Sequence, residues 1–257
     1  MDLKLKNKQF LVTGGTTGFG GAISNALAGE GANVIVVARS EEKLQELKER
    51  YPDQITPVQG DITNSGTIDK AVAEINSSTF NGAVINSGGP PAKAFLETTL
   101  QDWDESYQNL MRWKIEITQK ILPFLQKNGY GRMVYIESIS TKQPVENLVL
   151  SNSVRLGVVG FVKTLSQEIA GTGITLNILA PGYHDTAALN RLFKKKSELE
   201  GISEEEARKQ IEQKSPMGLG NPNDMASLAL WLLSPHSRYV TGQTISHDGS
   251  VMKGTFG

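Results

Sequence analysis

The sequence predicts an α/β fold in which one doubly wound, mostly parallel sheet of seven strands has helices on both faces. Short runs rich in Val and Ile alternate with segments of helical composition, and this alternation is typical of βαβ units. A glycine-rich turn follows the first run and precedes a helical segment. The length of 257 residues suits a single domain, 1–257, because no interior stretch has the composition of a linker.

The expected elements follow one another in chain order. Extended, β-rich runs are separated by amphipathic segments. Strands are predicted at 10–13, 33–38, 55–59, 83–86, 132–136, 174–179 and 243–246, and the clearest later helices at 102–127, 151–170 and 223–233. A polar, charge-dense stretch at about 187–214 interrupts this order, and we expect it to form a helical lid over the substrate site.

Composition narrows the function. The net charge of −1 argues against nucleic-acid binding. The chain has no cysteine, and its three histidines lack the spacing of zinc ligands, so no metal site is predicted. No run approaches about 18 apolar residues, and the N-terminus lacks the apolar core of a signal peptide. We therefore expect a cytoplasmic protein that binds neither nucleic acid nor membrane.

The glycine-rich turn predicts a dinucleotide site. A tight turn needs glycine for its positive φ, a backbone that approaches a pyrophosphate has no room for a Cβ, and the following helix offers free N–H groups to anions. Gly14, Gly18 and Gly20 have the positions for these roles. The sheet is therefore expected to be a Rossmann fold. The residues predicted to bind the cofactor from this turn are Gly14, Thr16, Thr17, Gly18, Phe19 and Gly20.

The end of the second expected strand indicates which dinucleotide binds. NAD enzymes place a carboxylate about 20 residues after the turn, on the ribose 2′-hydroxyl, whereas this strand ends in Ala38 and Arg39. A guanidinium matches the geometry of a 2′-phosphate. The sequence thus favours NADP(H) over NAD(H), the other interpretation being that Arg39 is a solvated residue opening the next helix.

Four segments of the chain resemble the short-chain dehydrogenase/reductase family. They are the TGxxxGxG spacing of the turn, Asp61-Ile62, Asn86-Ser87-Gly88-Gly89 and Pro181-Gly182. The resemblance implies that Asp61 and Ile62 bracket the adenine, and that the other segments complete the cofactor groove. The further cofactor-binding residues predicted in this way are Asp61, Ile62, Asn86, Ser87, Gly88, Pro181 and Gly182.

The same resemblance implies three catalytic positions, and two of them depart from the family pattern. A serine is present as Ser138, but the tyrosine position is Ser151 and the lysine position, four residues on, is Arg155. An i, i+4 pair still shares one helical face. An aliphatic hydroxyl is, however, a far weaker acid than a phenol of pKa about 10, and arginine keeps its proton. Ser138, Ser151 and Arg155 are therefore the predicted catalytic residues, and none of them is an evident proton donor.

Two residues on a loop could replace the missing acid. Tyr183 and His184 directly follow Pro181-Gly182, where the resemblance places the nicotinamide, and histidine titrates near neutral pH; the alternative is that they are loop residues with no role. Glu137 could pair with Arg155, but neighbouring residues of a strand point to opposite faces, so no such contact is expected and Glu137 is treated as structural. Leu110 stands where relatives often have an asparagine, so neighbouring Asn109 is given no role.

Three functions remain open from the sequence. The leading one is an NADP(H)-dependent oxidoreductase that interconverts a carbonyl and an alcohol. Its substrate would be a small molecule, an acyl thioester being one candidate, because the Ser87–Pro91 segment resembles a branch similar to 3-oxoacyl-carrier-protein reductases. The second is an NADP(H)-binding protein without turnover, and the third a lyase or epimerase. The resemblance also implies a homotetramer or homodimer.

Overall fold

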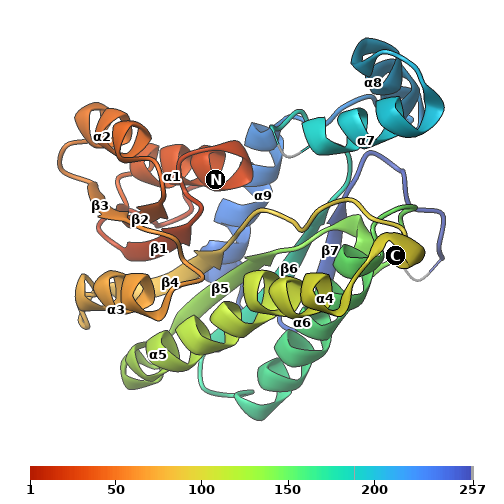
Figure 1. Ribbon diagram of the computed structural model, residues 1–257. Coiled ribbons are helices and arrows are strands. Elements are labelled where there is room, and N and C mark those ends of the chain that lie inside the picture. The colour runs from red at the N-terminus through yellow and green to blue at the C-terminus, as the bar shows by residue number, and fades with distance from the viewer. Residues whose placement is uncertain (188, 256–257) are drawn as a thin grey trace.

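A computed structural model describes residues 1–187 and 189–255 and contains one seven-stranded sheet. All neighbouring strands pair in parallel, in the order β3-β2-β1-β4-β5-β6-β7 (Figure 1). This order confirms the predicted doubly wound Rossmann fold. The strands are β1 (Gln9–Thr13), β2 (Asn33–Ala38), β3 (Ile55–Gln59), β4 (Phe80–Ile85), β5 (Gly131–Ile136), β6 (Ile174–Pro181) and β7 (Thr244–His247).

Helices cover both faces of the sheet (Figure 1). Alternate residues of β1 explain this layering, since Phe10 and Val12 pack with α1, α2 and α9, whereas Leu11 packs with α3, α5 and α6 on the other face. The helices are α1 (Gly18–Gly29), α2 (Glu41–Arg50), α3 (Ser65–Ala73), α4 (Leu100–Tyr107), α5 (Trp113–Asn128), α6 (Val149–Glu168), α7 (Asn190–Glu200), α8 (Glu204–Gln213) and α9 (Pro222–Leu233).

The long helix expected at 102–127 contains a π-helical turn. The π-helical turn spans Gln108–Arg112 and connects the end of α4 directly to the start of α5. A π turn carries more residues than an α turn, so it changes which later residues face the core. Leu110, Trp113 and Lys114 are all completely buried. A lysine thereby enters the interior of the protein.

The charge-dense stretch after β6 forms a pair of helices, α7 and α8, above the sheet edge (Figure 1). They share a small apolar cluster that includes Phe193, Ala207 and Ile211. Ser203 begins α8 as its N-cap, its Oγ accepting a hydrogen bond of 3.1 Å from the backbone N–H of Glu206. Position 188 of the expected lid lies outside the described residues. Within 1–187 and 189–255, no helix is long and apolar enough to cross a membrane.

Candidate active site

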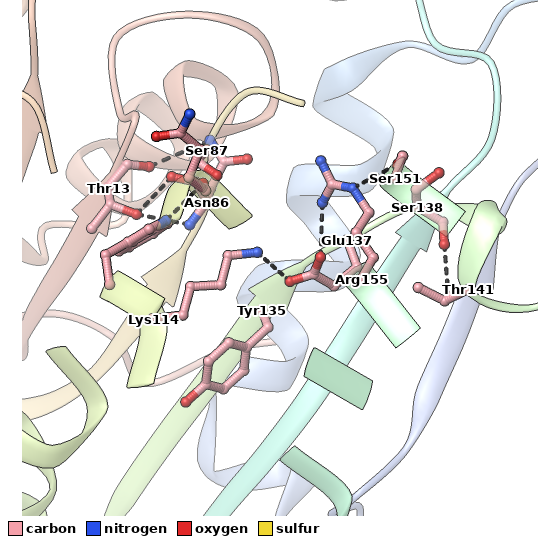
Figure 2. Close-up of polar contacts among 12 residues, drawn as sticks. Thr13, Asn86, Ser87, Lys114, Tyr135, Glu137, Ser138, Thr141, Ser151 and Arg155 are labelled. Atoms are coloured by element: carbon pink, nitrogen blue, oxygen red, sulfur yellow. Dashed lines mark hydrogen bonds and ion pairs between the residues drawn. The ribbon is translucent and has the colours of Figure 1, made fainter. Parts of the chain in front are cut away.

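The cofactor groove opens where β1 and β4 lie side by side and their crossovers leave in opposite directions, the usual ligand position in open α/β sheets. Thr13 and Asn86 join these two strand ends (Figure 2). The Thr13 Oγ1 donates to the Asn86 carbonyl oxygen and accepts from the Asn86 backbone N–H, both at 2.7 Å. These bonds hold the glycine-rich turn against the 86–89 segment.

The glycine-rich turn has the geometry that a pyrophosphate requires. Gly14 and Gly18 have positive φ values of 57° and 53°. A Cβ on Gly20 would lie 2.1 Å from the Gly14 carbonyl oxygen, and one on Gly14 would lie 2.9 Å from the Asn86 side-chain nitrogen. Side chains at these positions would therefore clash with the turn and with Asn86, and the first residues of α1, Gly18 and Phe19, line the groove.

A groove of about 660 Å³ extends from this turn along the ends of β2 and β3. Arg39 is exposed in its wall and has no hydrogen-bond or ion-pair partner among residues 1–187 and 189–255. Ser40 caps α2 by accepting from the Lys43 backbone N–H, and Lys43 also lines the groove. Lys43 was missed in the sequence, although its place one helical turn beyond Arg39 could have indicated it. The groove's lining includes all the predicted residues of the turn except Gly20, together with Arg39, Asp61, Ile62, Asn86, Ser87 and Gly88.

A smaller cavity of about 130 Å³ adjoins this groove. Ser138, Ser151 and Arg155 all line it, although they come from the end of β5 and from α6. The structure thus brings together the three positions that the sequence singled out. The other predicted site residues in its wall are Phe19, Asn86, Ser87, Gly88, Pro181, Gly182, Tyr183 and His184.

Hydrogen bonds orient both serine hydroxyls. The Ser151 Oγ accepts from Arg155 Nε at 3.1 Å, and the Ser138 Oγ accepts from the Ser140 backbone N–H at 3.1 Å. The Ser140 Oγ lies 3.4 Å from the Ser151 Oγ. A hydroxyl whose oxygen already accepts a bond from an N–H keeps its own proton to donate. Both serines can therefore donate to an oxygen bound in the cavity.

Glu137 corrects one expectation from the sequence. Its carboxylate accepts a hydrogen bond of 2.7 Å from Arg155 Nη1 and also pairs with Lys114 Nζ (Figure 2). The strand-alternation argument against a Glu137–Arg155 contact was wrong, because β5 ends at Ile136 and Glu137 is outside the regular pleat. Glu137 is thus part of the candidate site.

Lys114 is a second residue that sequence reasoning missed. Its side chain is completely buried. Burial, together with the nearby charge of Arg155, lowers the pKa of Lys114 to about 8, although Glu137 acts in the opposite direction. No sequence signal marked this lysine, because in an uninterrupted helix a lysine is normally assigned to the solvent face.

Tyr183 and His184 differ in what they can do. Tyr183 lines the small cavity and also an adjoining cleft of about 580 Å³, whose lining includes residues of α7 and α8. Burial and the charge of Glu146 raise the pKa of Tyr183, so its phenol stays protonated. His184 is buried, with Nδ1 3.2 Å from the Gly182 carbonyl oxygen and Nε2 2.9 Å from His247 Nδ1. Tyr183 is therefore the freer proton donor of the two.

Acid should weaken the fold through His184. Burial lowers the pKa of His184 below its usual 6.5, so unfolded chains take up a proton there before folded ones do. Its contribution to stability is complete above about pH 6.5 and is lost as pH falls through the lowered folded pKa. We expect the urea midpoint to fall between pH 7 and pH 5.5, and to fall less in His184→Gln. His236 is exposed. If His236→Gln diminished the acid-induced fall of the urea midpoint as much as His184→Gln does, this assignment would be contradicted.

Comparisons with known proteins agree with this geometry. The sequence model of a family described as enoyl-(acyl carrier protein) reductase matches residues 14–251. The chain is also similar to the 3-oxoacyl-(acyl-carrier-protein) reductase FabG of Aquifex aeolicus. The two are 29% identical over 258 residues, covering 98% of this chain and 100% of that protein. The similarity therefore includes the groove and the small cavity.

Solved structures share the fold over nearly the whole chain. A variant of actinorhodin polyketide ketoreductase with NADPH is 29% identical and has a TM-score of 0.89, covering 95% of this chain and 97% of that one. L-Sorbose reductase from Gluconobacter frateurii, complexed with NADPH and L-sorbose, has a TM-score of 0.89 at 24% identity. That match covers 99% of this chain and 100% of the other, and it shows the fold alone.

Within 1–187 and 189–255, no group of three or more His, Cys, Asp or Glu could hold a metal ion.

Proposed function

The chain belongs to the short-chain dehydrogenase/reductase family, and on that premise we propose that it is an NADP(H)-dependent reductase that interconverts a carbonyl and an alcohol. The observation that carries the proposal is the junction of two spaces. The groove built on Gly14 and Gly18 meets a small cavity that Ser138 and Ser151 line. A dinucleotide in the groove would bring its reactive end to the two hydroxyl donors.

NADP(H) fits the described residues better than NAD(H). Arg39 and Lys43 both line the groove, neither has an ion-pair partner among the residues that the structure describes, and Ala38 puts no carboxylate at the end of β2. A 2′-phosphate there would gain charge-assisted hydrogen bonds from the guanidinium. The solved structure of the actinorhodin polyketide ketoreductase variant contains NADPH, which supports the same choice.

Arg39→Ala should weaken NADPH binding and leave NADH binding nearly unchanged. A charge-assisted hydrogen bond contributes about 1.5–3 kcal/mol, which is roughly a 10- to 150-fold change in Kd. Calorimetric titration of both cofactors into the natural protein and the variant measures this effect. The exposed Arg50 on α2 pairs with Asn25 instead, so Arg50→Ala serves as the control. Equal affinities for the two cofactors in both proteins would contradict the assignment.

The small cavity supplies the substrate's oxygen with donors and a positive charge. When bound, NADPH would provide the hydride. Ser138 and Ser151 would donate hydrogen bonds to the carbonyl oxygen, and Arg155, whose Nε bonds the Ser151 Oγ, would stabilise the negative charge that develops there. The proton that completes the alcohol would come from Tyr183 or from water, because Ser151 beside Arg155 is not a competent acid.

The experiment that tests this proposal follows NADPH absorbance with a panel of carbonyl compounds, including 3-oxoacyl thioesters. One NADPH oxidised for each alcohol formed would support a reductase. A protein that binds NADPH without turnover is the second candidate, and the replacement of the family's Tyr and Lys by Ser151 and Arg155 favours it. A bound cofactor with no oxidation on any substrate would establish that alternative, and conversion without oxidation would indicate a lyase or epimerase.

Partners and location stay predictions. The resemblance to 3-oxoacyl-carrier-protein reductases makes an acyl thioester one substrate class to test, as in the panel above. A homotetramer or homodimer is expected, and sedimentation of the purified protein would distinguish these from a monomer. A cytoplasmic location is likewise expected.

A further inference from the structure

Three charged side chains from different parts of the fold meet in one cluster (Figure 2). Lys114 comes from α5, Glu137 follows β5, and Arg155 comes from α6. Their side chains are 0%, 0% and 6% exposed. Glu137 offers one carboxylate oxygen to each cation, Oε1 to Lys114 and Oε2 to Arg155. We call these three residues the ion triad.

Burial of the ion triad is unfavourable for the stability of the fold. Each charge loses its hydration on burial, and replacing such ions by apolar residues of similar volume often leaves a protein equally stable or makes it more stable. Two cations on one carboxylate also leave a formal charge of +1 in the interior. Stability alone therefore does not explain why these three charged residues lie together in the interior.

The triad determines where the Arg155 guanidinium points. Nη1 bonds Glu137, Nη2 lies 3.4 Å from the Gly88 carbonyl oxygen, and Nε bonds the Ser151 Oγ. A planar guanidinium that is held at three corners cannot rotate without breaking bonds. Its contact with Ser151 thus depends on Glu137, whose other oxygen is held by Lys114. Glu137 and Arg155 line the small cavity, whereas Lys114 does not.

We propose that Lys114 is a positioning residue: through Glu137 it fixes the Arg155 guanidinium against Ser151 and gives the ion triad the positive charge that a developing oxyanion requires. This role rests on the reductase function proposed above. Without Lys114, the freed Glu137 oxygen would draw the guanidinium into a two-point contact and turn Nε away from Ser151. The triad would also become neutral, and the stabilisation of an oxyanion would be lost with it.

The charge of the ion triad should respond to pH. Among the residues that the structure describes, the charged groups that face Lys114 are Glu137 and Arg155. Tyr135, which shares a hydrogen bond with Thr118 on α5, stays neutral because burial raises its pKa. With the pKa of Lys114 lowered to about 8, the triad carries +1 at neutral pH and loses this charge in more alkaline solution. A fall of kcat above about pH 8 is therefore expected.

The test compares Lys114→Met and Lys114→Arg with the natural protein. Misplacing a catalytic contact by about 1 Å costs on the order of 100-fold in rate, so we expect Lys114→Met to lower kcat by roughly this factor with little change in KM or NADPH affinity. Lys114→Arg should restore most of the rate and move the alkaline fall of kcat upward by more than one pH unit, because arginine does not titrate there. Lys120→Met is the control, since Lys120 lies on the same helix and pairs with Asp69 at the surface.

A second readout does not depend on turnover. In ¹⁵N spectra the Arg155 Nε–H, assigned by its loss in Arg155→Lys, should exchange slowly in the natural protein, in Lys114→Arg and in Lys120→Met. It should exchange fast in Lys114→Met. A slow signal and an unchanged kcat in Lys114→Met would overturn the proposal. So would an unmoved alkaline fall in Lys114→Arg, which decides the matter if Lys114→Met does not fold.

These readouts separate the proposal from the reductase function. If no carbonyl compound is reduced by the natural protein but the Arg155 signal behaves as expected, the reductase function fails and the positioning of Arg155 by Lys114 stands. If reduction is observed but the Arg155 signal is indifferent to Lys114, the positioning role alone fails.

Discussion

Glu137→Ala is expected to destabilise the protein by about 3–5 kcal/mol, the usual cost of removing one partner from a buried ion pair. The reason is that Arg155 would be left in the interior as a cation without its carboxylate, and Lys114, whose pKa Glu137 raises, would have to give up its proton. The change also leaves a cavity, which adds to the loss. Urea unfolding at pH 7, monitored by circular dichroism, measures the effect.

Two further variants serve as comparisons for Glu137→Ala. Glu42→Ala, at an exposed position of α2, should change stability by no more than about 0.5 kcal/mol. Replacing the whole ion triad by Lys114→Met, Glu137→Leu and Arg155→Leu should be far less harmful than Glu137→Ala, because no unpaired charge remains. A loss below about 1 kcal/mol in Glu137→Ala would show that water or another group already compensates the two cations.

The fold could be predicted because each of its signals is local. Alternation of apolar runs with amphipathic segments fixes the βαβ order, and all seven expected strands lie within three residues of those observed. The glycine-rich turn was equally readable, since Gly14 and Gly20 occupy places where a Cβ would meet backbone. Such requirements leave a trace in residue type and spacing, which is all that a single sequence contains.

The ion triad could not be predicted because it depends on two local irregularities. Glu137 was assigned to the wrong face by a rule that holds inside a strand, whereas β5 ends one residue before it. Lys114 was passed over because the π turn at Gln108–Arg112 changes the register of the helix that follows. Neither irregularity has a marker residue such as glycine or proline, so only the folded chain reveals it.

The candidate catalytic positions could be predicted in part. Ser138, Ser151 and Arg155 were identified by spacing, and the structure brings them to one cavity. The spacing did not reveal how they are bonded. Arg155 is held by a buried carboxylate, which suits the proposed role of a fixed positive charge beside a substrate's oxygen rather than that of a group that moves protons. The proton donor is therefore expected to be another group, and this expectation can be tested directly.

The double variant Ser151→Tyr with Arg155→Lys has the pair that the family resemblance implies at these positions. It is expected to raise carbonyl reduction about 10²- to 10⁴-fold, the usual contribution of general acid catalysis. A phenol beside an ammonium group is a competent proton donor, whereas an aliphatic hydroxyl beside a guanidinium is not. The structure supports the design, because position 151 lines the small cavity and a lysine at position 155 would still face Glu137. The measurement is kcat/KM with any carbonyl compound that the natural protein reduces.

The matched control for this gain is Ser151→Phe with Arg155→Lys, which has the same ring without the hydroxyl and should show no increase. If the tyrosine variant binds NADPH normally and is no faster than this control, the natural protein already has an acid elsewhere. Tyr183 is then the residue to change, because its protonated phenol lines the same cavity. A loss of about 10²-fold or more in Tyr183→Phe would identify it as the donor, and full activity in that variant would leave water as the source of the proton.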